Sequence, residues 1–174
     1  MKKIRLGIIG MGNMGSAHAK SIVEGMCPAF ELVAIADIKP NRLAWGSNEE
    51  YGKNINRFST AEEMLDSGLL DACIIAVPHY DHPKYAMMGF DYGLHVLIEK
   101  PAGVYTKQVR EMNEAAKKQN KVFAIMYNQR TNPMYKKIKN LVESGQLGHI
   151  KRITWIVTNW YRPQAYHDSS SWRS

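Results

Sequence analysis

A glycine-rich turn near the amino terminus constrains this chain more than any other feature. The apolar run at residues 4–9 passes directly into Gly10, Gly12 and Gly15, and a segment of helical character follows. The first glycine permits a tight strand-to-helix turn, the second lets a pyrophosphate touch the backbone, and the third lets the helix lie close to the strand. The helix dipole then faces the phosphates. We predict a dinucleotide site formed by Gly10, Gly12, Asn13, Met14 and Gly15; the alternative is a purely structural turn.

The end of the next predicted strand, Glu31–Ala36, indicates which dinucleotide binds. A carboxylate in the position of Asp37 can accept both ribose hydroxyls of NAD and repel the extra 2′-phosphate of NADP. Lys39 and Arg42 on the following turn could partly neutralise such a phosphate, and we count Arg42 among the cofactor-binding residues. We therefore expect NAD in preference to NADP. Asp37 could also serve only to start the turn before Pro40.

Short apolar runs alternate with helical segments along the rest of the chain. Runs rich in β-branched residues predict strands covered on both faces over residues 71–77, 94–98 and 122–127. Helices are expected over residues 60–67, which open with a capping-box pattern, 82–92 and 106–119. This alternation predicts an α/β fold, a doubly wound parallel Rossmann sheet over residues 1–127, with its ligand beyond the carboxyl ends of the strands.

Two loops at that edge of the sheet carry the remaining candidate residues. The loop after the strand at 71–77 contains Val77, Pro78, His79 and His82, which we expect to line the cofactor cleft, although His82 could merely begin a helix. The next strand is followed by Glu99, Lys100 and Pro101. A lysine held between an acid and a proline could bind a substrate hydroxyl or carbonyl. The alternative for Lys100 is a solvated side chain on an ordinary loop.

These motifs occur in an order and spacing that resembles the glucose-fructose oxidoreductase and inositol dehydrogenase family, often written Gfo/Idh/MocA. The resemblance rests on the glycine turn, Asp37, the Val77-Pro78-His79 loop, Glu99-Lys100-Pro101 and the segment from Asn128 to Pro133, and it covers essentially the whole chain. It implies that Lys100 binds the substrate and relays its proton, and that the Lys100–Pro101 bond is cis. It also adds Glu99, Lys100 and Asn128 to the expected cofactor site.

The resemblance further implies a second α/β domain, of which this chain would hold only the truncated start, residues 128–174. A helix is expected over residues 134–144, and alternating apolar residues predict one long strand over 150–161. A strand without a partner leaves the backbone N–H and C=O groups along its edges without hydrogen bonds to another strand. We expect Tyr161, Trp172 and Arg173 to contribute to a sugar site, and we expect this chain alone to be inactive, because the family's second catalytic group is absent.

Composition narrows the function further. The net charge of +7 and the pI near 9.4 invite a nucleic-acid interpretation, but the basic residues are scattered rather than gathered with aromatics, so no nucleic-acid partner is expected. Cys27 and Cys73 form no disulfide framework and are typical of a cytoplasmic protein, and no metal site is expected. No apolar run approaches a membrane span. Family resemblance suggests a homo-oligomer.

Three functions of different classes remain open. The leading hypothesis is an NAD-dependent oxidoreductase that acts on a secondary alcohol or ketone of a sugar, inositol or related polyol, with Lys100 helping the hydroxyl lose its proton. The second is a non-redox or regulatory dinucleotide-binding protein, which would need Asp37 but not Lys100. The third is an NAD-dependent glycosidase of the same fold, an analogy at the level of the family.

Overall fold

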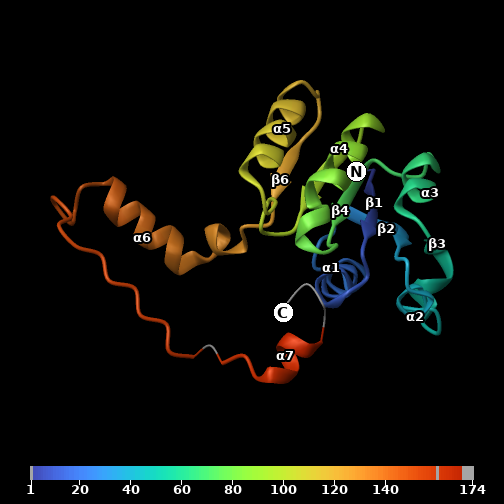
Figure 1. The fold of residues 1–174 in the computed structure, drawn as a ribbon, viewed down its shortest axis with the longest axis horizontal. Helices are drawn as coiled ribbons and strands as arrows, with labels where there is room; N and C mark the ends of the chain where they lie inside the picture. The colour runs from blue at the N-terminus through green and yellow to red at the C-terminus, as the bar shows by residue number, and fades with distance from the viewer. Residues whose placement is uncertain (1, 160, 170–174) are drawn as a thin grey trace. The chain divides into compact units, whose positions relative to one another are not determined.

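The computed structural model describes residues 2–159 and 161–169, and the chain divides into two units, Met1–Met126 and Tyr127–Ser174. The first unit is a parallel sheet with strand order β3-β2-β1-β4-β5-β6 (Figure 1). Its strands are β1 (Ile4–Ile9), β2 (Phe30–Ala36), β3 (Asn56–Phe58), β4 (Ala72–Ile75), β5 (His95–Ile98) and β6 (Phe123–Ile125). The predicted Rossmann fold is confirmed. The strands expected in this unit are present: β1 has the expected bounds, β2 begins one residue earlier, and β4, β5 and β6 are shorter than expected. The short strand β3 was not predicted from the sequence.

Helices cover the sheet on both faces and form two hydrophobic clusters with it. The helices of the first unit are α1 (Asn13–Val23), α2 (Pro40–Leu43), α3 (Ala61–Asp66), α4 (His82–Asp91) and α5 (Thr106–Lys117), with the 3-10 turns η1 (Glu50–Asn54) and η2 (His79–Asp81). One cluster joins α1 to β1, β2 and β4 through Ile8, Ile35 and Ile74. The other joins α3, α4 and α5 to the opposite face through Met64, Phe90 and Met112. Both faces of β4 are thereby buried, as its continuous apolar sequence predicts.

Local sequence signals explain where several helices begin. Thr60 Oγ1 accepts a 3.2 Å hydrogen bond from the backbone N–H of Glu63, which is one arm of the predicted capping box at the start of α3. The other arm differs from expectation, because the Glu63 carboxylate accepts a 3.1 Å bond from the Ser59 hydroxyl. Pro83 in the first turn of α4 loses no helical hydrogen bond there.

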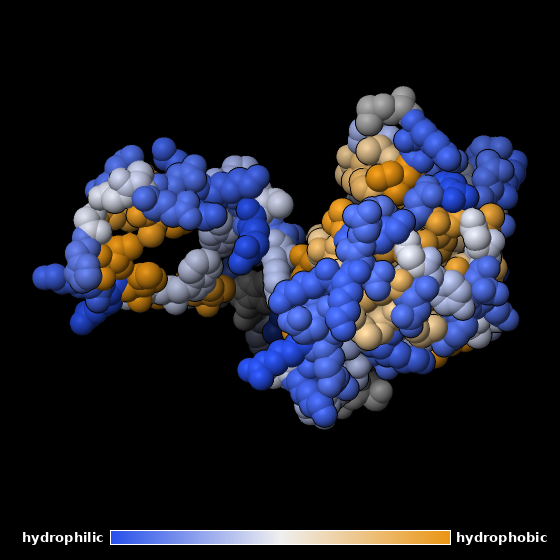
Figure 2. All heavy atoms as spheres, turned by 90° about the horizontal axis from the view of Figure 1, so that it is seen from above, coloured by the Kyte–Doolittle hydropathy of each residue, from blue (hydrophilic) through white to orange (hydrophobic). Residues whose placement is uncertain are grey.

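The second unit contains η3 (Asn128–Thr131), α6 (Pro133–Glu143) and α7 (Gln164–Asp168). Asn132 caps α6 by accepting a 2.9 Å bond from the backbone N–H of Met134, and Gly145 follows the helix with a positive φ of 73°. Trp155 stacks on Tyr135 of α6, with ring centroids 5.4 Å apart. In Figure 2 hydrophobic atoms of this unit gather around the hollow between α6 and the segment after it.

The prediction of a long strand over residues 150–161 is wrong for the part that the structure describes. Residues 150–159 have no regular secondary structure, and Ile153, Trp155 and Val157 are all more than half exposed. The physical reason is the one that the sequence already suggested: a strand is stabilised by hydrogen bonds to a neighbouring strand, and the described residues of this unit offer no such neighbour.

Across the described residues, no helix has the length and apolar character needed to cross a membrane.

Candidate functional site: the carboxyl edge of the sheet

The candidate site lies where the direction of the strand order reverses, between β1 and β4. Both strands are parallel and end side by side, and the backbone N–H of Ala76 donates a 2.8 Å bond to the carbonyl of Ile9. The loops after these strands therefore diverge into a crevice at the carboxyl edge of the sheet. In doubly wound folds this crevice is the place where ligands bind.

The three glycines of the turn have distinct geometries. Gly10 has a φ of +90°, and a Cβ on it would lie 2.7 Å from the carbonyl oxygen of Ala76, so the turn admits only glycine. A Cβ on Gly15 would overlap the carbonyl oxygen of Gly10, which lets α1 start close to β1. A Cβ on Gly12 would meet only Nη1 of Arg42, at 3.8 Å. The space beside Gly12 is therefore open, whereas Gly10 and Gly15 are required because neighbouring backbone atoms lie close to them.

That open space is bounded by the first turn of α1. Gly12 is the N-cap residue, no side chain caps the turn, and no acidic residue lies in it. Asn13 and Met14 are exposed there. An uncapped helix start with a bare glycine backbone attracts an anion through its N–H groups and its dipole. These features fit the pyrophosphate of a dinucleotide.

Asp37 closes the crevice on the side of β2. Its side chain is almost fully buried. Oδ2 accepts a 2.8 Å bond from the backbone N–H of Met11, and Oδ1 accepts a 2.8 Å bond from the backbone N–H of Lys39. Arg42 Nη1 lies 3.5 Å from Oδ2. The carboxylate thus holds the glycine turn, and the Arg42 guanidinium lies beside both Asp37 and Gly12.

The Glu99-Lys100-Pro101 segment follows β5 at the same edge. The Lys100–Pro101 peptide bond is cis, as the resemblance implied, and the Lys100 side chain is exposed. We expected Glu99 to contact the cofactor. Instead the residue is buried; Oε1 lies 2.7 Å from His18 Nε2, and Oε2 accepts a 3.1 Å bond from the backbone N–H of Lys100.

Electrostatics keep Glu99 ionised. Burial alone would raise the pKa of this carboxyl group, but the hydrogen bond and charge of His18, together with the Lys100 N–H and charge, outweigh burial and hold the pKa below its ordinary value. The carboxylate is therefore an ionised group fixed inside the protein.

The loop after β4 departs from prediction at His82. We expected this side chain to line the cofactor cleft, but it is fully buried at the start of α4, the alternative that the sequence left open. Its Nδ1 lies 2.6 Å from the carbonyl oxygen of Pro101 and its Nε2 lies 2.9 Å from that of Val77. His82 therefore ties the two loops together. Its ring lies edge-on to that of His79, with centroids 5.7 Å apart, and His79 and Val77 are partly exposed.

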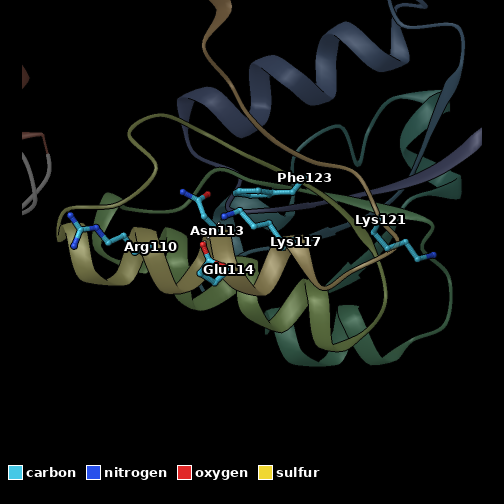
Figure 3. Close-up of a pocket in the computed structure, with 7 residues that line it drawn as sticks. Arg110, Asn113, Glu114, Lys117, Lys121 and Phe123 are labelled. Atoms are coloured by element: carbon cyan, nitrogen blue, oxygen red, sulfur yellow. Dashed lines mark hydrogen bonds and ion pairs between the residues drawn. The ribbon is translucent and has the colours of Figure 1, made fainter.

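A separate hollow of about 470 Å³ lies along α5 and β6 (Figure 3). It contains none of the residues that we predicted to bind cofactor or substrate. Its lining side chains include Arg110, Lys117 and Phe123, and Lys117 is paired with Glu114 at 2.7 Å. Figure 3 shows Arg110 pointing away from Phe123. This hollow is therefore separate from the loops of the carboxyl edge that carry the candidate residues of the first unit.

Comparison with known proteins agrees with this geometry. A sequence model for an oxidoreductase family with an NAD-binding Rossmann fold, Gfo/Idh/MocA, matches residues 4–127. The chain belongs to this family. Its expected NAD cofactor agrees with the family's description, and the matched residues include the glycine turn, Asp37 and Lys100.

Individual Gfo/Idh/MocA relatives resemble much of this chain. The rhizopine catabolism protein MocA of Rhizobium meliloti is 30% identical over 151 residues, which are 86% of this chain and 45% of the relative. The crystal structure of myo-inositol 2-dehydrogenase from Lactobacillus plantarum has 31% identity and a TM-score of 0.78, over 86% of this chain and 43% of that one.

A further solved structure is that of the WlbA dehydrogenase from Bordetella pertussis in complex with NADH and UDP-GlcNAcA. It has 28% identity and a TM-score of 0.84, over 98% of this chain and 48% of that one. The chain therefore spans about half the length of the relatives that it matches.

One residue of the site was missed by the sequence analysis. His18 lies on the same face of α1 as Gly15, Ala19 and Ile22, which are all buried against the sheet. A polar residue within an apolar helical stripe was the available signal.

The assignments of Asn128 and Tyr161, in the second unit, remain predictions, and Trp172 and Arg173 lie outside the described residues.

Proposed function

We propose that this protein is an NAD-dependent oxidoreductase that interconverts a secondary alcohol and a ketone on a sugar, inositol or related polyol. The observation that carries the proposal is the presence of an open glycine cradle and a lysine at the same edge of one sheet. Family membership and the NADH in the WlbA complex support the cofactor. The inositol dehydrogenase from Lactobacillus plantarum supports the substrate class.

The chain's residues divide the work between binding and proton transfer. Gly12 and the start of α1 receive the pyrophosphate, and Asp37 accepts hydroxyls of the adenosine ribose. Lys100 binds the substrate hydroxyl and takes its proton as the carbon gives up hydride. A bound NAD would supply the acceptor for that hydride, its nicotinamide ring. Val77, Pro78 and His79 border the crevice in which the ring would lie.

A second substrate class has its own support. The WlbA structure, which holds the nucleotide sugar UDP-GlcNAcA, matches more of this chain and with a higher TM-score than the inositol dehydrogenase does. A nucleotide sugar acid is therefore the second candidate. In either case the partner is a small molecule.

We also propose that the enzyme is a homo-oligomer and that it is cytoplasmic. The free thiols of Cys27 and Cys73 are in keeping with the second of these proposals.

The test is an activity panel on the full-length gene product. NADH formation is measured with NAD and, in parallel, inositols, free sugars and UDP-linked sugar acids. Turnover of any member of the first two groups supports the leading proposal, and turnover only of UDP-linked acids supports the second candidate. NAD binding with no turnover across the panel favours the regulatory alternative.

A further inference from the structure

The pairing of His18 with Glu99 joins two parts of the site that lie far apart in the sequence. Their side chains are only 18% and 7% exposed, and the atoms Nε2 and Oε1 are 2.7 Å apart. Glutamate is seldom buried in a protein interior unless it is paired. Because a carboxylate oxygen can only accept, Nε2 of His18 carries the hydrogen.

The other oxygen of the same carboxylate acts on Lys100. The backbone N–H of Lys100 donates to Oε2 at 3.1 Å, directly before the cis bond to Pro101. A hydrogen bond to an ionised group is stronger than one between neutral groups. The orientation of the Lys100 backbone therefore depends on Glu99 being held in place, and His18 holds it.

His18 belongs to the helix that begins at the cradle. It lies in the second turn of α1, three residues after Gly15, whose close contact with Gly10 fixes the helix to the turn. We infer that His18 and Glu99 are a positioning pair, through which the cofactor-binding helix sets the orientation of Lys100. This inference rests on the proposed function for the role of Lys100, but the contacts that carry it involve only α1 and the loop after β5.

Amide hydrogen exchange measured by NMR on the 174-residue chain tests the inference. In His18→Leu, Glu99 loses its donor, and in Glu99→Leu the oxygen that accepts from Lys100 is removed. We expect the Lys100 amide to exchange about tenfold faster in both variants, as expected for local opening. The Val96 amide, which donates to Val122 at 2.9 Å within the sheet, should keep its rate. His18→Gln, whose side-chain amide can still donate, should restore protection of Lys100.

A matched control is Glu114→Gln, since Glu114 also forms an ion pair at 2.7 Å, with Lys117 on the surface of α5. This variant should leave the Lys100 amide unchanged. Addition of NAD should alter the Lys100 amide in the wild type and in His18→Gln, and should alter it less in His18→Leu.

The possible outcomes separate the inference from the proposed function. Unchanged exchange at Lys100 in both His18→Leu and Glu99→Leu overturns the positioning role, as does equal acceleration at Lys100 and Val96, which indicates general loosening. If the wild type fails to bind NAD, the proposed function fails, and the exchange rates without NAD still decide whether the pair positions Lys100. Rescue by His18→Gln supports the pair.

Discussion

The backbone N–H of Met11 donates a 2.8 Å hydrogen bond to Oδ2 of Asp37. This contact fixes the glycine turn after β1 to the carboxylate after β2, so one side chain both shapes the cradle and places a negative charge at its edge. The 2′-phosphate of NADP would meet that charge, and Arg42, 42% exposed and 3.5 Å away, offsets it only in part. We expect NAD to bind at least about tenfold more tightly than NADP.

Calorimetric titration with both cofactors measures this preference, and Asp37→Asn tests its cause. The asparagine can still accept from Met11 but carries no charge, so the gap between the two affinities should narrow. Equal or tighter binding of NADP by the wild type would show that Lys39 and Arg42 outweigh the carboxylate.

The glycines of the turn give a second prediction. Gly12→Ala adds a Cβ into open space at a φ of −73°, so its free energy of unfolding should stay within about 1 kcal/mol of the wild type while NAD affinity falls. Gly15→Ala places its Cβ against the Gly10 carbonyl and should lower the free energy of unfolding by about 2 kcal/mol or more. Urea unfolding and NAD titration of both variants distinguish the two roles. Normal NAD affinity in Gly12→Ala would exclude the cradle from pyrophosphate binding.

Lys100 gives a third prediction, in the full-length gene product. Lys100→Ala should lower kcat by on the order of 10²-fold, because a proton-transfer group is lost, and should change NAD affinity far less. Steady-state kinetics with the best substrate of the panel measure the effect. Lys84→Ala is a control, since Lys84 is also exposed but pairs with Glu62. An unchanged kcat in Lys100→Ala would return Lys100 to the class of solvated loop lysines.

Asp71 makes stability depend on acid pH. Hydrogen bonds from the Arg5 side chain and backbone, at 2.8 to 3.1 Å, lower the pKa of Asp71 from 3.8 to about 2. Because the pKa is lower in the folded than in the unfolded state, the pair stabilises the fold fully above pH 3.8, and this contribution is lost as the pH falls toward 2. The effect is small, because both side chains are more than one third exposed.

Thermal unfolding between pH 5 and pH 2 tests this linkage. In Asp71→Asn the part of the stability loss that belongs to this carboxyl group should be absent, so the difference between variant and wild type should shrink as the pH falls. A difference that is independent of pH would assign the role of Asp71 to packing alone.

The sequence predicts most of the first unit because its signals are local. The apolar runs of β1, β2, β4 and β5 and the capping box at Thr60 each specify an element without help from distant residues. The short strand β3 escaped prediction because its three residues, Asn56–Phe58, carry no apolar run, and its pairing with β2 defines it. The reverse happened over residues 150–159, where a strand-like pattern lacks the partner that a strand needs.

The site was predictable in its types of residue but not in its contacts. The glycine turn and Asp37 follow from spacing, whereas the roles of Glu99 and His82 depend on which distant atoms they meet. Glu99 contacts His18 of α1, and His82 contacts the carbonyl oxygens of two loops. Both residues therefore hold the loops around the crevice in place. No pattern within either loop distinguishes a residue facing a ligand from one facing its neighbouring loop.

Calorimetric titration of the 174-residue chain with NAD tests the central claim most directly. The claim is that residues 4–127 form a cofactor-binding domain, and that its glycine turn has the shape needed for pyrophosphate before NAD binds. The account predicts saturable binding of one NAD molecule per chain, no NADH production from polyols or sugars by this chain alone, and loss of the binding heat in Gly12→Ala. Absence of saturable binding in a chain that unfolds cooperatively would contradict the account.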